Sequence, residues 1–305
     1  MDRPLAEIGI RAVRLALELG ATDAECYAAG GDEFSVSVRM REIETIKEAG
    51  SRGASLRVFR GKRSGAAYTS DLSDEGLARM AANALELSMV TTEDPDAGLP
   101  AEDELGSAAG DLALYHEDVA RLEAGFKIAQ AKEAEEAALT YDPRIANSEG
   151  SSFESHVGQR AFANSHGFAG AYRASRCSLG VMPVAREDGS MERDYWITVA
   201  RTAAGLERPN DVGRLAAERA VRRLHARKIE TQKVPVVFEP RVARTLLGHL
   251  FEAVSGESVY RRASYLAGKL GETIAAAPVT VKDDGTLPCL IGSAPFDGEG
   301  VPTRR

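Results

Sequence analysis

Residues 241–271 read RVARTLLGHLFEAVSGESVYRRASYLAGKLG and contain the most apolar helix that the sequence predicts. Apolar side chains recur in this stretch at steps of three and four residues, which is the spacing of one helix face. They are Leu246, Leu247, Leu250, Phe251 and Val254. Pro240 suits the first turn because its missing N–H would be unpaired there, and Gly256 suits the end. We therefore expect a helix with a buried apolar face.

The same helix has only part of what a zinc peptidase needs. Such a helix carries two histidines about one turn apart and a glutamate beside the first, which acts as the general base. Glu252 stands where that glutamate would be, but Phe251 and Gly256 stand where the ligands would be. Neither residue offers a side-chain donor, so the sequence predicts no metal here. Without a metal-bound water, Glu252 has no evident catalytic partner.

Other candidate sites are weaker still. His249 and Glu252 are three residues apart on one helix face, but a metal would need a third ligand from elsewhere in the chain. The other histidines are His116, His156, His166 and His225. Ser255 and Ser258 lack a nucleophile motif, and the acidic runs at 283–284 and 297–299 are interpreted as turns. Tyr260, Arg261 and Arg262 are given no role.

Several distinctive stretches are spread along the whole chain. They are LFEAVSGESVYRRASYL at 250–266, ASLRV at 54–58, YTSDL at 68–72, DP and GLP within 94–100, and GSAPFDGEGVPT at 292–303. Together these stretches resemble the TldD/PmbA peptidase family. The zinc-binding branch of that family carries His-Glu-x-x-x-His at the place of residues 251–256. The PmbA (TldE) branch lacks those histidines, and the resemblance is to this branch.

The resemblance implies a function. The chain would be a PmbA/TldE-like subunit of a cytosolic TldD/TldE-type metalloprotease that processes or degrades peptides, and it would be the partner that binds no metal. Zinc is then expected in a TldD-like partner subunit, with self-association as another possibility, and the substrate would be an extended peptide. Two alternatives stay open: an active metallopeptidase in its own right, or a peptide-binding modulator outside any protease.

Composition limits the class of protein. The 305 residues are enough for two or three structural units, and 44% hydrophobic with 28% charged residues is ordinary for a soluble globular chain. A formal net charge of −8 argues against a general nucleic-acid binder. No apolar run predicts a signal peptide or a membrane span, and three scattered cysteines favour reduced thiols. We therefore expect a cytoplasmic protein that binds neither nucleic acid nor membrane.

The predicted fold class is α+β. Residues 1–110 should form an N-terminal domain of antiparallel strands and flanking helices, and residues 111–230 a helix followed by a β-meander. Residues 231–305 should begin a mainly-β C-terminal domain, which is truncated because family members continue beyond it. Helices are expected at 5–19, 75–90, 117–139 and 211–228, and strands at 23–27, 34–41, 43–48, 54–59, 234–238 and 278–281. Gly30-Gly31-Asp32 is expected to be a turn, and the small residues of 169–178 a closely packed face or a groove for another backbone.

Overall fold

The computed structural model describes residues 3–305, which form two compact units. The first unit comprises the chain up to His225 together with Asp283–Arg305, and the second is Ala226–Lys282. All the named strands belong to the first unit, whereas the second contains two helices, α6 (Pro240–Val254) and α7 (Gly256–Tyr260). None of the helices described is long and apolar enough to cross a membrane.

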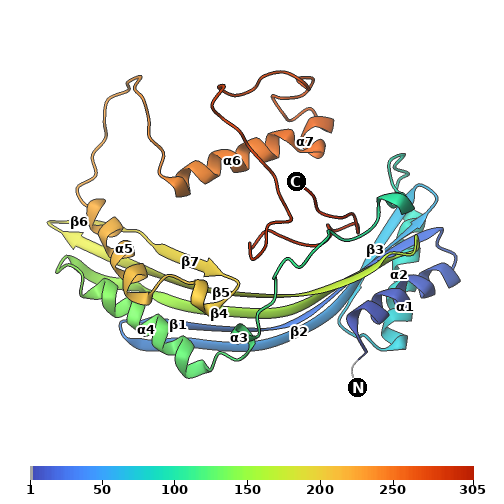
Figure 1. Ribbon diagram of the computed structural model, residues 1–305, viewed down its shortest axis with the longest axis horizontal. Coiled ribbons are helices and arrows are strands. Elements are labelled where there is room, and N and C mark those ends of the chain that lie inside the picture. Colours follow the sequence, from blue (N-terminus) through green and yellow to red (C-terminus); the bar gives the residue numbers. More distant parts are fainter. Residues whose placement is uncertain (1–2) are drawn as a thin grey trace. The chain divides into compact units, whose positions relative to one another are not determined.

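The first unit is built on one seven-stranded antiparallel sheet (Figure 1). Its strands are β1 Asp23–Arg39, β2 Glu42–Arg60, β3 Arg63–Thr69, β4 Ile145–Asn164, β5 Ala169–Glu187, β6 Ser190–Arg193 and β7 Trp196–Ala200. The order across the sheet is β3-β2-β1-β4-β5-β6, with β7 also paired to β5. Strands of 17 to 20 residues accumulate twist, and the sheet is visibly curved. The expected α+β class is confirmed.

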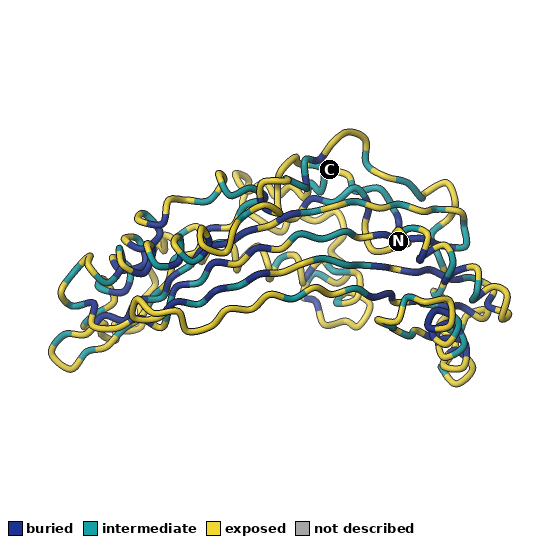
Figure 2. The backbone as a smooth tube through the Cα atoms, turned by 90° about the horizontal axis from the view of Figure 1, so that it is seen from below, coloured by how far each residue is buried: buried dark blue, intermediate teal, exposed yellow. Residues whose placement is uncertain are grey.

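Helices pack at both ends of these strands. The helices of this unit are α1 Leu5–Glu18, α2 Asp74–Val90, α3 Glu117–Ala120, α4 Ala124–Leu139 and α5 Pro209–Arg222, with short 3-10 turns at Glu102–Glu104 and Ala203–Gly205. One apolar core lies where α1 and α2 meet the sheet, and a second where α4 and α5 meet it. In Figure 2 the buried residues, in dark blue, gather toward these two ends.

Strand periodicity accounts for both cores. Cys26 and Ala28 of β1 belong to the first core, and Phe34, Val36 and Val38 of the same strand to the second. Side chains of a strand alternate between faces, so these even-numbered residues share one face of β1. The alternation predicted for residues 34–41 is therefore confirmed as far as Val38. We call this side of the sheet the covered face and the opposite side the open face.

The predicted turn at Gly30-Gly31-Asp32 is wrong, because β1 runs through it without a break. Glycine is needed there for close approach: a Cβ on Gly31 would lie 2.5 Å from the carbonyl oxygen of Val157 in β4. The strands predicted at 43–48 and 54–59 likewise join into β2. The turn that reverses the chain is Met40-Arg41, where both residues have positive φ, 50° and 71°.

That hairpin is held by a carboxylate from α4. The Glu135 side chain is fully buried, and its two oxygens accept the N–H groups of Met40 at 3.0 Å and Arg41 at 2.6 Å. Both N–H groups of the turn thereby have an acceptor. The helix predicted at 117–139 is interrupted between α3 and α4, so Glu135 lies on a helix that begins only at Ala124.

The C-terminal part differs from expectation in two respects. The helix predicted from residue 240 is present as α6, but Ala253 is its only buried residue, and Leu247 is 52% exposed and Phe251 69% exposed. The strands predicted at 234–238 and 278–281 are wrong: residues 231–305, all of which are described, contain only the isolated bridge Phe296–Pro302. An apolar run needs a neighbouring strand to pair with, and these runs have none.

Strands from both sides of residue 110 share the sheet, because β1 pairs with β4 along residues 25–38. The division into domains at residues 110 and 230 stays a prediction.

Candidate functional site

The residues singled out as positions of a degenerate metal motif lie on α6 and α7. Phe251 and Glu252 lie in the last turn of α6, Ser255 separates the two helices, and Gly256 begins α7. Within residues 3–305 no group of three His, Cys, Asp or Glu side chains is arranged to hold an ion. At positions 251 and 256 the side chains are a benzyl group and a hydrogen, neither of which can ligate zinc. The residues present do not fit the metal that the resemblance implies for the other branch.

The histidines are spread over separate environments. His116 Nε2 lies 3.4 Å from Cys289 Sγ, His166 Nε2 lies 3.3 Å from Asp23, and His225 Nε2 lies 2.9 Å from Glu187. His249 is exposed on α6, and His156 lines a cavity on the open face. No cluster of candidate ligands among the described residues supports the metal site considered for His249 and another histidine.

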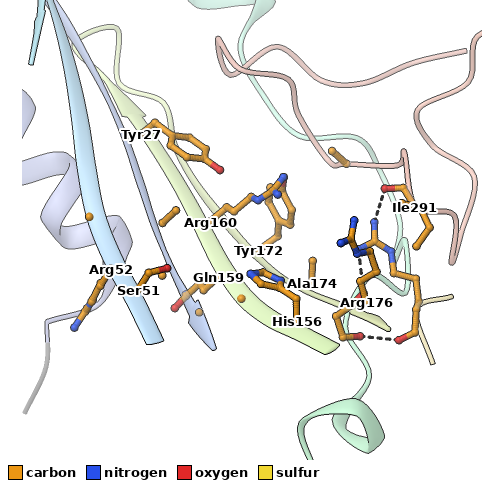
Figure 3. A pocket seen from close by; sticks show the side chains of 18 of the residues that line it. Tyr27, Ser51, Arg52, His156, Gln159, Arg160, Tyr172, Ala174, Arg176 and Ile291 are labelled. Carbon is orange, nitrogen blue, oxygen red and sulfur yellow. Dashed lines mark hydrogen bonds between the residues drawn. The ribbon is translucent and has the colours of Figure 1, made fainter. Parts of the chain in front are cut away.

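That cavity is the most distinctive feature of the open face. It has a volume of about 560 Å³ and is formed by β1, β2, β4 and β5 together with residues 291–294. Figure 3 shows Tyr27, Arg160, Tyr172 and Arg176 among the side chains around it. All these elements belong to the first compact unit.

The floor of the cavity is a row of very small residues. Ser51, Gly31, Gly158 and Ala174 face one another across β2, β1, β4 and β5. The row on one side contains Arg160 opposite Tyr172, and the row on the other contains His156 opposite Arg176. The small row therefore makes a groove that crosses the strands between two lines of larger polar side chains. Ala174 and Ser175 line it, in agreement with the groove expected from the small residues of 169–178.

Three arginines line this groove without a carboxylate partner. Arg160 Nη1 lies 3.4 Å from the Tyr172 hydroxyl, and the Arg176 guanidinium has no hydrogen-bond or ion-pair partner among residues 3–305. Arg201 is 8% exposed and donates to the carbonyls of Ser175 at 3.2 Å, Leu290 at 3.1 Å and Ile291 at 2.9 Å. Its buried Nε has no partner. Arg201 thus ties residues 290–291 to β5 and forms one wall.

The electrostatic environment of the groove is positive. None of the residues that line it is Asp or Glu, although the chain has 46 acidic and 38 basic residues. Burial lowers the pKa of His156, and the charges of Arg160 and Arg176 lower it further. Burial, followed by the charge of Arg160, also lowers the pKa of Arg201. An anion in this groove would meet cationic groups already placed there.

A second feature is the outer edge of β2. β3 pairs only with Ala54–Arg60, so residues 42–53 of β2 have a strand neighbour on one side alone in the part of the chain that is described. Alternate N–H and C=O groups of such an edge point outward and can pair with another extended chain. Ser51 belongs to both this edge and the floor of the groove.

Comparison with known proteins gives the family. Residues 24–88, 117–224 and 231–305 match, in that order, domain 1, the central domain and the C-terminal domain of the PmbA/TldA metallopeptidases. The chain belongs to this family. Metalloprotease PmbA of Escherichia coli O157:H7 is 40% identical over 297 residues, which cover 96% of this chain and 66% of that protein. These matches confirm the family that LFEAVSGESVYRRASYL and the other stretches indicated.

Solved structures agree on the fold. A Bacteroides thetaiotaomicron protein described as a candidate modulator of DNA gyrase superposes with a TM-score of 0.91 at 26% identity, covering 97% of this chain and 67% of that one. TldE from Thermococcus kodakarensis gives a TM-score of 0.77 at 18% identity, covering 97% and 66%, and supports the fold alone. The chain spans about two thirds of the length of the E. coli relative, which is 66% covered.

Sequence reasoning did not find the arginine groove. Arg160, Arg176 and Arg201 are far apart in the sequence and meet only through the β4–β5 register and the β5–β7 pairing. A local signal does exist: Gly158 stands two residues before Arg160, and Ala174 two residues before Arg176. In strands this spacing puts a small residue and an arginine on the same face.

Proposed function

We propose that this chain is the PmbA/TldE-like subunit of a TldD/TldE-type metalloprotease in the cytoplasm, and that it binds no metal itself. The observation that carries this proposal is the residue pair Phe251 and Gly256, which removes both imidazole ligands around Glu252. In this proposal the zinc and the metal-bound water belong to a TldD-like partner, and this chain contributes substrate-binding surface. Family membership and the name metalloprotease PmbA of the E. coli relative support it.

The substrate in this proposal is an extended peptide. Backbone pairing to a free strand edge holds a peptide with little dependence on its side chains, and residues 42–53 of β2 offer such an edge. The groove beside it is lined by Ser51, Gly31, Gly158 and Ala174, so another backbone can come close to the sheet. Peptide processing or degradation is the reaction class that fits a subunit with these features and a zinc-bearing partner.

Metal content and activity with and without the partner test the proposal. The purified chain should contain far less than one zinc per molecule and should not hydrolyse an unfolded peptide such as casein fragments, whereas adding a TldD-like protein with His-Glu-x-x-x-His should produce hydrolysis. Stoichiometric zinc together with hydrolysis by this chain alone would instead establish it as a peptidase. Co-purification from native lysate separates the remaining alternative, because a modulator outside any protease would recover no histidine-bearing relative.

A further inference from the structure

The groove on the open face has the chemistry of a carboxylate site. Arg160 and Arg176 rise from β4 and β5 on either side of the floor made by Gly158 and Ala174 (Figure 3). A guanidinium presents a planar set of donors that matches the two oxygens of a carboxylate. In the part of the chain that the structure describes, no Asp or Glu oxygen lies within 4.0 Å of either guanidinium, so their donors are available except for Arg160 Nη1, which donates to the Tyr172 hydroxyl.

Two acidic residues lie beside the groove but not in it. Glu33 and Glu154 line an adjoining hollow with His156 and Arg176. Glu33 is paired with Lys47, and Glu154 accepts a hydrogen bond from Ser178 at 3.5 Å. Arg52, which also borders the groove, donates to the carbonyl of Arg3 and points away from Arg160 in Figure 3. The positive character of the groove is thus carried by Arg160 and Arg176, with Arg201 behind them.

Arg201 keeps the groove open and positive. It donates to the Ser175 carbonyl of β5 and to the Leu290 and Ile291 carbonyls, which positions residues 290–291 as a wall, and no carbonyl neutralises its charge. The charges of Arg160 and Arg176 both act on it. Three like charges in a half-buried cavity repel one another, which costs stability unless an anion enters. In a chain of net charge −8, such a cluster indicates a ligand rather than a general basic surface.

We propose that this groove binds a carboxylate of an extended peptide, with Arg160 and Arg176 as the binding residues and Arg201 as a positioning residue. The proposal rests on the peptide-holding role proposed above and adds a substrate preference to it. The carboxylate is either the C-terminal one or an Asp or Glu side chain of the peptide. A single-stranded nucleic acid would need a longer basic track than one cluster beside the acidic residues Glu33 and Glu154.

Fluorescence anisotropy with four labelled peptides of one length tests the preference. The peptides are a neutral amidated one built of Ala, Ser and Thr, the same sequence with a free C-terminal carboxylate, an amidated one with an internal Glu, and its Gln counterpart. We expect the free acid or the Glu peptide to bind roughly tenfold more tightly than its neutral counterpart, because each adds a charge-assisted contact. Which of the two gains affinity identifies the source of the carboxylate.

Substitution locates the effect. Arg160→Gln and Arg176→Gln should each remove most of the preference for the carboxylate while leaving the affinity for the neutral peptide within about twofold. The matched control is Arg173→Gln, because Arg173 lies on the same strand but on the covered face, above the Tyr115 ring at 3.6 Å. It changes net charge by the same amount and should keep the preference.

The possible failures are distinguishable. Equal binding of all four peptides, or an unchanged preference in both arginine variants, would overturn the carboxylate proposal while leaving peptide holding intact. Absence of binding by every peptide would overturn both proposals. Tighter binding of a single-stranded oligonucleotide than of the Glu peptide would also reject it in favour of a nucleic-acid ligand.

Discussion

The two faces of β1, β4 and β5 have opposite compositions although the same strands form both. On the covered face, Val36, Phe153 and Leu179 stand opposite one another and are buried beneath α4 and α5. On the open face, the rows three, five and seven residues away along the strands contain histidine, arginine, glycine and tyrosine. Successive side chains of one strand therefore alternate between the apolar core and the groove. Loss of a side chain on the covered face should therefore change folding more than loss of a side chain on the open face.

The largest effect should follow the loss of a covered-face aromatic ring. Phe153 is fully buried and packs edge-on against Phe126, with ring centroids 6.3 Å apart. Phe153→Ala should lower the free energy of unfolding by about 3–5 kcal/mol, because it removes buried surface and leaves a cavity. Urea denaturation measures this. The open-face counterpart Tyr68→Ala removes a ring that is 70% exposed and should cost less than about 1 kcal/mol; equal losses would contradict the contrast between faces.

The next effect concerns the hairpin under the covered face. Glu135→Gln keeps the size of the side chain but replaces one of the two oxygens that accept the N–H groups of Met40 and Arg41. One backbone donor then faces an amide NH₂ at the buried position of residue 135, so we expect a loss of about 2 kcal/mol in the free energy of unfolding. The control is Glu136→Gln, the neighbouring exposed residue that pairs with Arg41, which should cost under about 1 kcal/mol. Equal losses in the free energy of unfolding for the two variants would contradict a special role for the buried Glu135 carboxylate.

A smaller effect should arise in the floor of the groove. Gly31→Ala places a methyl group against the Val157 carbonyl and should cost roughly 1–3 kcal/mol, because the strands must move apart. Gly298→Ala, where nothing lies within 4 Å of the added carbon, is the control. Thermal denaturation compares the two, and a neutral result for Gly31→Ala would show that the floor is not closely packed.

The thiols should distinguish the covered face from the returning segment 283–305 without any mutation. Cys26 and Cys177 lie on the covered face, where burial raises their pKa to about 12 and about 11. Since the thiolate is the reactive form, both should be unreactive toward Ellman's reagent at pH 8 in the native protein. Cys289 is exposed and should react fast, with the other two reacting only in denaturant. Fast reaction of more than one thiol per native chain would contradict this.

Short-range patterns predicted much of the covered face and little of the open one. The spacing of Leu5, Ile8 and Ala12 and the alternation of Phe34, Val36 and Val38 follow directly from burial, and both are found. Gly30-Gly31 was interpreted as a turn because glycine suits turns and close contacts equally well in sequence. The decisive contact with Val157 is 126 residues away (157 − 31) and depends on register.

The groove illustrates the same limit. Arg160, Arg176 and Arg201 are unremarkable in sequence, and only the β4–β5 pairing and the return of residues 290–291 bring them together. For α6 the limitation is different. The stripe containing Leu246 and Phe251 predicted a buried face, but periodicity states only that a helix has an apolar side and not which element covers it.

The chain leaves the first compact unit at residue 226 and returns to it at residue 283. The returning segment is attached by the Cys289 N–H to the Leu112 carbonyl at 2.9 Å, by the Arg201 contacts, and by Arg57 to Glu299 at 3.3 Å. A protease that cuts once between these points would therefore yield two pieces that stay together. The nicked protein should elute from gel filtration as the intact one does and come apart only in denaturant.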